Sequence, residues 1–526
     1  MISAARGIRL AVVGAVLAVT SVLVVPAAPA AEAAASSRVS GDDRYETAAA
    51  ISKASFPDAS KVERVFIVSG NGFADGLSAG PAAVATHGAV LLSGVGDLPA
   101  ATAAEVRRLA PDEIVIVGGT GAVSSAVRKK LESLAPHVRR IGGIDRYETS
   151  RNVAEYAFAA GSSQVYLATG RDFPDALSGG ALAVKNAAPV LLIDGGRTGI
   201  DAATRDTLRQ LDAERITVFG GTGVLSSELV SAASAITGAK KSRLGGASRY
   251  ETSARIAKAF GSSRTAIVAT GRDYPDALSA IQLSAARGAP IVLTIPQCVS
   301  AETKQALSGA RSLMIVGGVG AVRGLVASRA ACQPTTSATS PWTMVNKKNT
   351  LRPLTYAPSD LRTVAGTNQL MRREAATALE KMIAAAKKEG AGRIKPGSGY
   401  RSYSTQKYMF NSAVASKGRA KAELGTARPG HSEHQSGWTM DVVACTTTNC
   451  SGIDYFGGSP QGRWTVKNAH KYGFIVRYEP GYTKITGYAS EPWHLRYVGK
   501  ALATDYKKGG FHTLEQYLDF PAAPSY

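Results

Sequence analysis

Short apolar segments alternate with longer segments of helical spacing through the first 330 residues of the chain. Val65–Val68, Ala89–Leu92 and Ile114–Val117 are apolar at every position, which predicts strands that are buried on both faces. Gly76–Thr86 and Ala101–Leu109 lie between these segments, and their spacing predicts helices. This alternation is typical of an α/β unit, in which helices cover a parallel sheet.

The whole pattern occurs three times. The sequence DRYET at Asp43–Thr47 returns at Asp145–Thr149 and, as SRYET, at Ser248–Thr252. Two further markers, FADGLS or PDALS and a strand followed by GGTG or GGVG, keep the same order in each copy. Each copy is about a hundred residues long, so we predict three domain-sized α/β modules rather than turns of a short solenoid. Their expected bounds are 38–137, 138–240 and 241–334.

The glycines that follow the third strand of a copy, such as Gly118 and Gly119, predict tight turns. No lysine follows them as in a P-loop, and no complete dinucleotide fingerprint is present, so nucleotide binding is not expected. By its RYET and PDALS markers, the region resembles the cell wall binding repeat 2 family. The resemblance implies three modules around a pseudo-threefold axis that anchor an exported protein non-covalently to an anionic secondary wall polymer.

The repeated arginines Arg44, Arg146 and Arg249 have two interpretations. They could contact the wall polymer, or each could form a salt bridge inside its own module, with the glutamate of the RYET motif or with an aspartate. We expect the salt bridge. The repeated aspartates are expected to cap the helices that start near them; they are Asp75, Asp175 and Asp276.

The second half of the chain has a different pattern. Met371–Lys388 has the spacing of an amphipathic helix, while Tyr472–Tyr478 and Tyr488–Tyr497 are rich in aromatic and β-branched residues and predict strands. We therefore expect an α+β domain at 347–526, with segregated layers. Residues 335–346 are small, polar and interrupted by proline, which predicts a linker.

The first 31 residues have the features of a secretory signal peptide. Two arginines precede an apolar run from Leu10 to Val25, and small residues suitable for cleavage follow it. An uncleaved membrane anchor is the alternative, because the run approaches the length that spans a bilayer. We predict cleavage at the end of 1–31, and no membrane association afterwards.

The charge balance favours an anionic partner. Lysine and arginine exceed aspartate and glutamate by 21. For an exported protein, wall polymers that carry phosphate or uronate groups are the expected partner, and no nucleic-acid motif with interleaved aromatic residues is present. The excess charge could also serve solubility alone. The sequence does not predict the oligomeric state.

Four cysteines in an exported chain suggest two disulfides. We expect Cys445–Cys450, which would close a small loop, and Cys298–Cys332, which would tie the end of the third module. A metal site that includes Cys445 and Cys450 is the competing interpretation, and oxidising surroundings argue against it.

A candidate metal site lies in the second half. His434, Asp441 and His494 offer two imidazole nitrogens and a carboxylate oxygen, a donor set that suits zinc and leaves a fourth position for water. Glu491, three residues before His494, is then a candidate general base. Four of the seven histidines of the chain fall within the same sixty-odd residues, and these are His431, His434, His470 and His494. The spacing of seven residues between His434 and Asp441 does not by itself bring the two together.

Three sequences in order, SGYRS at Ser398–Ser402, SEHQSG at Ser432–Gly437 followed by Asp441, and EPWHLRYVG at Glu491–Gly499, resemble the VanY-like D-alanyl-D-alanine carboxypeptidases, which are zinc peptidases of the M15 family. The resemblance implies that His434, Asp441 and His494 are the zinc ligands and that Glu491 is the catalytic base.

It also implies that Arg401 holds the substrate and stabilises the oxyanion, and that Ser432 lies beside the substrate. Gln406 and Tyr488 are further candidates for contacts with the peptide. The residues Trp438–Met440 depart from the smaller apolar residues usual in the family.

The sequence therefore predicts an exported, cell-wall-associated zinc carboxypeptidase that acts on peptidoglycan stem peptides. A cross-link endopeptidase is one alternative. A non-catalytic wall adhesin or surface-layer component is another, although such a protein would have no need of Glu491.

Overall fold

A computed structural model describes Met1, residues 35–447 and residues 449–526. The predicted signal peptide, apart from Met1, lies outside the described residues. Within the described part of the chain, no helix has both the length and the apolar character needed to cross a bilayer.

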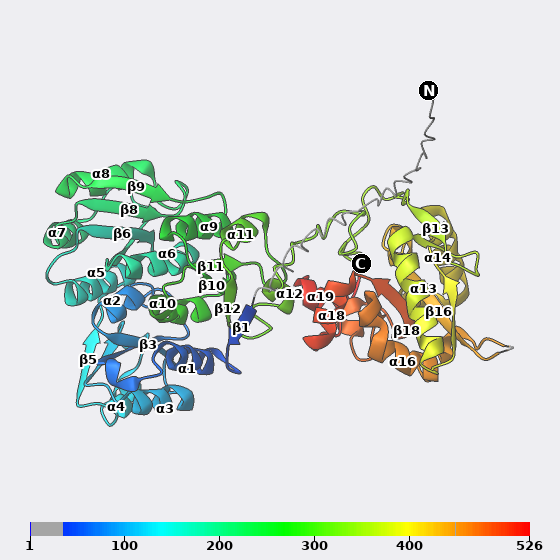
Figure 1. Ribbon diagram of the computed structural model, residues 1–526, viewed down its shortest axis with the longest axis horizontal. Coiled ribbons are helices and arrows are strands. Elements are labelled where there is room, and N and C mark those ends of the chain that lie inside the picture. Colours follow the sequence, from blue (N-terminus) through cyan, green and yellow to red (C-terminus); the bar gives the residue numbers. More distant parts are fainter. Residues whose placement is uncertain (2–34, 448) are drawn as a thin grey trace. The chain divides into compact units, whose positions relative to one another are not determined.

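The first half contains three parallel four-stranded sheets, one for each module (Figure 1). The strand orders are β3-β2-β4-β5, β7-β6-β8-β9 and β11-β10-β12-β1. The strands are β1 (Ala35–Val39), β2 (Arg64–Ser69), β3 (Gly88–Ser93), β4 (Glu113–Val117), β5 (His137–Ile141), β6 (Gln164–Thr169), β7 (Val190–Ile193), β8 (Arg215–Phe219), β9 (Lys240–Leu244), β10 (Thr265–Thr270), β11 (Ile291–Thr294) and β12 (Ser312–Val316). The predicted α/β modules with parallel sheets are confirmed.

Helices alternate with these strands along the chain and cover the sheets. They are α1 (Arg44–Ser55), α2 (Ala79–Ala85), α3 (Ala100–Leu109), α4 (Ser125–Leu131), α5 (Arg146–Ala157), α6 (Pro174–Lys185), α7 (Ala202–Leu211), α8 (Ser227–Thr237), α9 (Arg249–Phe260), α10 (Pro275–Arg287), α11 (Ala301–Ala306) and α12 (Gly324–Ala327). The RYET motif begins α1, α5 and α9. In α1, the Asp43 carboxylate accepts from the N–H groups of Tyr45 and Glu46, and Glu46 accepts from the N–H of Asp42. The glutamate of the motif is therefore a capping residue.

The three modules share one apolar core, in which α2, α6 and α10 contact one another. Ile281 of α10 packs so closely on Gly80 and Gly180 that a Cβ at either glycine would lie 2.8 or 2.6 Å from it. Phe73, Phe173 and Tyr274 come from equivalent positions of the three modules, and their ring centroids lie 5.6 to 5.9 Å apart. The modules therefore meet around a pseudo-threefold axis.

The strand before each RYET motif belongs to the sheet of another module. Strands β5 and β9 complete the first and second sheets, and β1 pairs in parallel with β12 and so completes the third. Arg38 secures this strand by donating to the carbonyls of Gly317 and Val322. The sequence repeats and the structural modules are thus out of step by one strand, and the chain closes a ring.

The expectation that each repeated arginine forms a salt bridge inside its own module is wrong for Arg44 and Arg249. Arg249 donates to Gly271 O and pairs with Asp172 at 3.3 Å, which links the third module to the second. Arg44 donates to Gly70 O and lies 3.8 Å from Asp273, which links the first module to the third. These salt bridges join different modules.

The repeated aspartates do not cap helices. The residues at the N-cap of α6 and α10 are Phe173 and Tyr274, and Asp175 and Asp276 stand in the first helical turn. The carboxylate of Asp175 instead lies under the turn after β8, where Gly220 has a φ of +104° and leaves no room for a side chain. Burial raises the pKa of Asp175 to about 6, although a hydrogen bond from Thr252 of the next module acts in the opposite direction.

The second half is built on an antiparallel sheet of order β15-β16-β18-β17. Its strands are β13 (Leu361–Thr363), β14 (Leu370–Arg372), β15 (Arg393–Ser398), β16 (Thr439–Cys445), β17 (Phe474–Tyr478) and β18 (Glu491–Tyr497). Its helices are α13 (Arg373–Lys388), α14 (Tyr403–Lys417), α15 (Arg419–Gly425), α16 (Pro460–Asn468), α17 (Thr483–Thr486), α18 (Lys500–Lys508) and α19 (Leu514–Leu518). The predicted α+β domain is confirmed.

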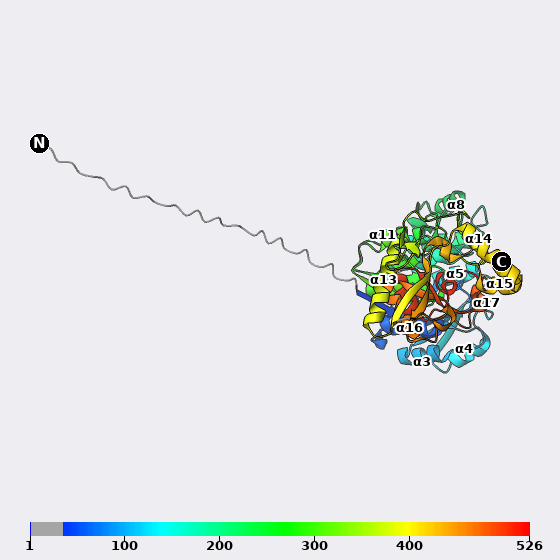
Figure 2. The ribbon, with the colours of Figure 1, turned by 90° about the vertical axis from the view of Figure 1, so that its right-hand side faces the viewer.

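Helix α13, drawn in yellow, lies along the strands of this sheet in both views (Figure 2). It buries Leu379 and Met382 against Met440 and Leu495. Side chains alternate along a strand, so Asp441 and His494, which are paired in register, share the opposite face. The sheet thereby separates the apolar core from the candidate metal site.

The segment predicted as a linker is not an exposed connection in its second half. Trp342, Met344 and Val345 are 6%, 3% and 0% exposed. The Trp342 indole donates to the Val498 carbonyl. The small polar residues around these apolar side chains gave the segment its linker-like composition, although Trp342 and Met344 pack into the second domain.

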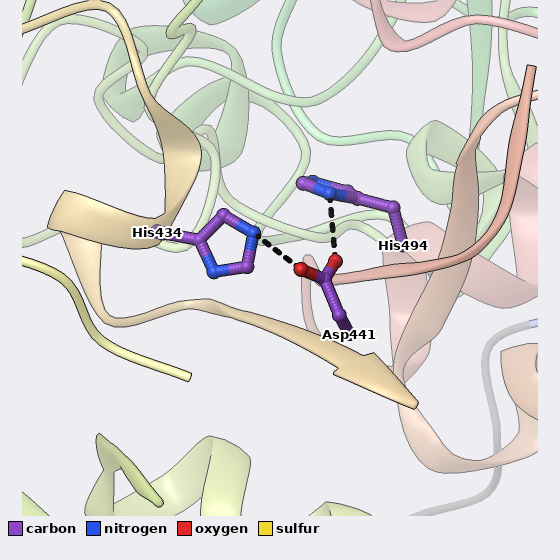
Figure 3. Close-up of side chains that lie close together, drawn as sticks. All are labelled: His434, Asp441 and His494. Carbon is purple, nitrogen blue, oxygen red and sulfur yellow. Dashed lines mark ion pairs between the residues drawn. The ribbon is translucent and has the colours of Figure 1, made fainter. Parts of the chain in front are cut away.

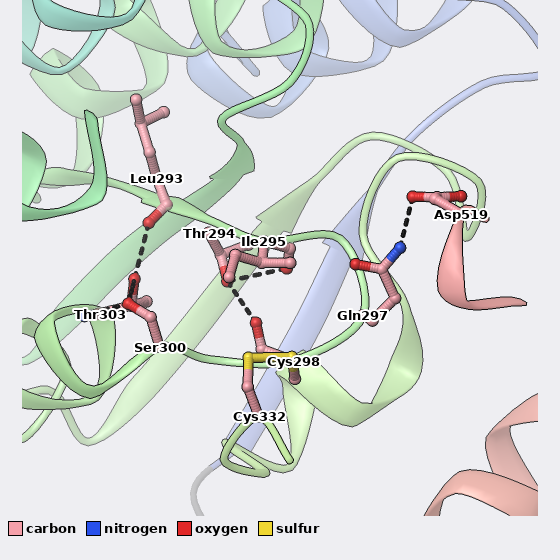
Figure 4. Close-up of a disulfide and its surroundings, with 9 residues drawn as sticks. All are labelled: Leu293, Thr294, Ile295, Gln297, Cys298, Ser300, Thr303, Cys332 and Asp519. Atoms are coloured by element: carbon pink, nitrogen blue, oxygen red, sulfur yellow. Dashed lines mark hydrogen bonds between the residues drawn. A yellow bond between two sulfur atoms is a disulfide. The ribbon is translucent and has the colours of Figure 1, made fainter. Parts of the chain in front are cut away.

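Both expected disulfides are formed, Cys298–Cys332 and Cys445–Cys450. The first ties the loop after β11 to the segment after α12 (Figure 4). Thr294 donates its hydroxyl to the Cys298 carbonyl at 3.1 Å, and Gln297 in the same loop donates to the carboxylate of Asp519.

Candidate metal centre

Three side chains from three different elements meet on the open face of the antiparallel sheet (Figure 3). His434 comes from the 3-10 turn η2 (Glu433–Ser436), Asp441 from β16 and His494 from β18. One candidate ligand atom from each lies within 4.8 Å of the others. Their exposures are 1%, 9% and 4%. The folded chain therefore joins residues that their sequence spacing left apart.

The carboxylate of Asp441 lies between the two imidazoles. Its Oδ2 is 3.2 Å from His434 Nε2, and its Oδ1 is 3.1 Å from His494 Nδ1. Both His434 Nε2 and Asp441 Oδ1 are buried atoms without a hydrogen-bond partner among the described residues. Orphaned donor and acceptor atoms of this kind are expected where a metal ion is bound, and two nitrogens with one oxygen suit zinc.

Each histidine is oriented by a bond from the nitrogen that faces away from Asp441. His434 Nδ1 lies 2.8 Å from the Gly399 carbonyl, which makes Nδ1 the donor and leaves Nε2 free for a metal. His494 Nε2 lies 3.3 Å from Glu433 Oε2, which leaves Nδ1 free. The two histidines thus present different nitrogens to the same point.

The pKa values of the metal-free site follow from burial and from the neighbouring charges. Burial, together with the charge of Arg401, lowers the pKa of His434 to about 4. Burial also opposes a charge on His494, but the carboxylates of Asp441 and Glu433 beside it outweigh that effect and raise the pKa of His494 to about 9. The pKa of Asp441 lies well below its usual range, because the two histidines overcome the effect of burial.

Glu491 has the properties of a general base. Its Oε2 lies 3.4 Å from His494 Nδ1. Burial raises its pKa to about 7, and the charge of Asp441 acts in the same direction, while His494 and Arg401 act against it. A carboxylate with a pKa near neutrality can take up and return a proton efficiently.

Arg401 and Ser432, two of the residues predicted to contact the substrate, lie close to the three clustered side chains. The charges of Asp441 and Glu491 oppose the lowering of the Arg401 pKa by burial, and its Nε has no partner in the described part of the chain. Ser432 is buried and directly precedes η2.

Gln406 and Tyr488 make other contacts. Gln406 is fully buried and donates to the Ala427 carbonyl at 2.7 Å. Tyr488 packs on Tyr478, whose ring lies 4.8 Å from that of His494, and its hydroxyl lies 3.1 Å from the hydroxyl of Tyr526. No hydrogen bond or ion pair within the described part of the chain joins either residue to the three clustered side chains, so their roles in peptide binding stay predictions.

Sequence reasoning missed a buried ionic network beneath His494. Glu433 Oε1 lies 2.8 Å from Arg477 Nε and 3.0 Å from Arg496 Nη1, and Arg477 also forms a bidentate pair with Glu515. All four of these residues are 0–2% exposed. The adjacency of Glu433 to His434 was the available signal, but nothing in the sequence indicated its arginine partners.

Comparison with known proteins assigns both halves. Residues 38–128, 140–230 and 243–326 match the family described as cell wall binding domain 2, or CWB2, and together these matches cover more than half of the chain. The chain belongs to the CWB2 family. Residues 368–500 match a second family, VanY, described as D-alanyl-D-alanine carboxypeptidase. The second half is therefore a VanY carboxypeptidase domain, and the predicted pair of resemblances is confirmed.

Individual relatives agree with this division of the CWB2 protein. A D-alanyl-D-alanine carboxypeptidase of Enterococcus faecium is 35% identical over 29% of this chain and 46% of its own length. The structure of Cwp6 from Clostridium difficile is 25% identical over 72% of this chain and 61% of that chain, with a TM-score of 0.52. Four curated relatives are matched over 46% to 66% of their own lengths.

Zinc is the cofactor of VanY peptidases. A vancomycin resistance D,D-pentapeptidase VanY, solved in complex with Zn(II), is 31% identical over 33% of this chain and 97% of that chain, with a TM-score of 0.29. The residues that match the VanY family include His434, Asp441 and His494, and a donor set of two imidazole nitrogens and one carboxylate oxygen suits zinc.

Proposed function

We propose that this chain is an exported zinc carboxypeptidase that removes a terminal D-alanine from peptidoglycan stem peptides while its three CWB2 modules hold it at the wall. The single observation that carries the proposal is the cluster of His434, Asp441 and His494 with Glu491 beside it. A binding protein derived from a peptidase would need the shape of the site but not a base whose pKa lies near 7.

In the proposed mechanism, the atoms that would hold the metal are His434 Nε2, an Asp441 oxygen and His494 Nδ1. Zinc in such a site supplies a Lewis acid and lowers the pKa of a bound water. Glu491 accepts a proton from the attacking water and later delivers it to the leaving amine. Arg401 would hold the substrate and offset negative charge that develops on the scissile carbonyl oxygen.

Attachment to the wall is proposed to act through effective concentration. An enzyme fixed to an insoluble polymer meets its substrate repeatedly without a new diffusional encounter. The excess of 21 basic residues supports an anionic polymer that carries phosphate or uronate groups as the partner of the modules. Binding to purified wall should weaken as salt is raised, and removal of the polymer from the wall should abolish it.

The first test is the release of D-alanine from a soluble stem pentapeptide by the mature protein. Release should stop with a chelator and return with added zinc. The Glu491→Gln variant keeps the size of the side chain but not a titratable carboxylate, so release should fall by about 10²–10⁴-fold while binding to wall is unchanged.

Two other outcomes would redirect the proposal. Zinc binding without release from the pentapeptide, together with cleavage of cross-linked muropeptides, would assign an endopeptidase. Wall binding without zinc or any cleavage would assign an adhesin and overturn the enzymatic proposal.

A further inference from the structure

We propose that Glu433 is a positioning residue for the metal centre: its carboxylate holds His494 with Nε2 as the donor, so that Nδ1 faces the metal. The inference rests on the proposed zinc site and adds a residue that acts through His494 rather than on the metal or the substrate.

The two ring nitrogens of His494 face two different carboxylates. Its Nε2 lies 3.3 Å from Glu433 Oε2, while its Nδ1 lies 3.1 Å from Asp441 Oδ1. A neutral imidazole carries one proton, and a carboxylate oxygen accepts but does not donate. A proton on Nε2 is shared with Glu433, and Nδ1 then keeps its lone pair for a metal. Carboxylates in this arrangement orient ligand histidines in many metal sites.

Glu433 itself has no freedom to move. Its Oε1 is held by Arg477 and Arg496, and Arg477 is fixed on its far side by Glu515. Glu433 is 2% exposed, and both arginines are 0% exposed. Burying two arginines and two glutamates costs free energy that apolar residues of similar size would not require. A structural role alone gives no reason for this choice beside a metal ligand.

The segment once expected as a linker completes the network. Arg496 donates to the carbonyls of Pro341 and Thr343 at 3.1 and 2.8 Å, and Asn346 donates to Glu515 at 3.0 Å. Nη2 of Arg496 and an acceptor of Glu515 are thereby satisfied within the interior. Glu433 is thus clamped from several sides, and only its Oε2 is left to face His494.

Substitution of Glu433 separates this role from a structural one. A glutamine has a single acceptor oxygen, whereas one oxygen of Glu433 accepts from Arg477 and pairs with Arg496, and the other oxygen faces His494. In Glu433→Gln, the amide N–H group must face either the arginines or His494 Nε2. The first choice places donors against donors, and the second forces the His494 proton onto Nδ1.

The matched control is Glu515→Gln. Glu515 belongs to the same buried network and contacts the same arginine, but it makes no contact with His494. Zinc affinity is measured on the full mature chain by competition with a chelating dye, and stability by urea unfolding followed by tryptophan fluorescence. We expect the zinc Kd of Glu433→Gln to rise about 10–100-fold and that of Glu515→Gln to change less than about threefold, although both variants lose stability.

A second measurement uses the unaltered protein and covers the case in which the variants fail to fold. With only seven histidines in the chain, selective ¹⁵N labelling of histidine gives few signals, and the His494 signals are those that His494→Gln removes. In the zinc-loaded protein, His494 should carry its proton on Nε2. A proton on Nδ1 would overturn the inference, as would folded Glu433 variants with wild-type zinc affinity. If the wild-type chain binds no zinc at all, the proposed function fails instead.

Discussion

Two buried aspartates between the CWB2 modules make the stability of the repeat domain depend on pH. Burial is the largest cause that raises the pKa of Asp175 from 3.8 to about 6, and of Asp276 to the same value. Between about pH 4 and pH 6 the folded protein therefore binds more protons than the unfolded chain. The contribution of these two aspartates to the stability of the repeat domain is therefore most favourable below about pH 4, falls as the pH rises through this window, and is constant above it.

The magnitude follows from the size of the shift. A change of about two pKa units corresponds to about 3 kcal/mol for each group, and partial contact with solvent reduces this to about 1–3 kcal/mol. Asparagine has nearly the same shape, can still accept from Thr252 and carries no charge to desolvate. Asp175→Asn should therefore stabilise the repeat domain by about 1–3 kcal/mol at pH 7.5 and leave it unchanged near pH 3.5.

The chain offers an internal reference for the measurement. All four tryptophans, Trp342, Trp438, Trp464 and Trp493, lie in the second half. Tryptophan fluorescence then reports the carboxypeptidase domain, and far-ultraviolet circular dichroism reports both halves. The repeat domain therefore unfolds in a transition that circular dichroism detects and tryptophan fluorescence does not. In Asp175→Asn, only this transition should move to a higher urea concentration.

A control and a refuting result complete the design. Asp112→Asn replaces an exposed carboxylate of the first module and should have no effect at either pH. Equal or lower stability of Asp175→Asn at pH 7.5 would show that an ionised Asp175 is needed, and would refute the reasoning from burial.

Two further changes test the packing of the second half and the disulfides. Trp342→Ala should lower the urea midpoint of the carboxypeptidase domain by the equivalent of about 3–5 kcal/mol, because it empties a buried site and leaves the Val498 carbonyl without its donor; a shift below about 1 kcal/mol would restore the view of this segment as a linker. Replacing both cysteines of Cys298–Cys332 by serine should cost about 4 kcal/mol, against about 2 kcal/mol for Cys445–Cys450, since a chain-entropy account scales with a separation of 34 residues against 5. Equal losses in thermal unfolding of the two double variants would contradict that account.

The elements of the fold were predictable because each depends on a local pattern. The segment Val65–Val68 could only be a strand buried on both faces, and β2 spans Arg64–Ser69. The capping sequence of RYET begins α1, α5 and α9. The three candidate metal ligands could also be predicted, since they fall in motifs. That Asp441 and His494 lie side by side depends on the register of β16 with β18.

The errors share a physical cause, which is that they concern contacts between segments far apart in the chain. The partner of Arg249 is Asp172 of another module, and no periodicity relates the two. The proposed role of Glu433 depends on its contacts with Arg477 and Arg496, which are distant in the sequence. Trp342 was hidden among small polar residues, and only the surface of the folded domain makes it an interior residue.

The pairing of β1 with β12 has a consequence for the order in which the chain can fold. Arg38 and the Gly317 carbonyl that it contacts are 279 residues apart. The first described strand is made first, yet its neighbours in the sheet are made only when the third module is complete, and long loops of this kind close slowly. Until β1 docks, the edge of β12 that does not face β10 is unpaired and is open to a β1 strand from another molecule. Domain-swapped dimers are therefore the expected product of refolding at high concentration.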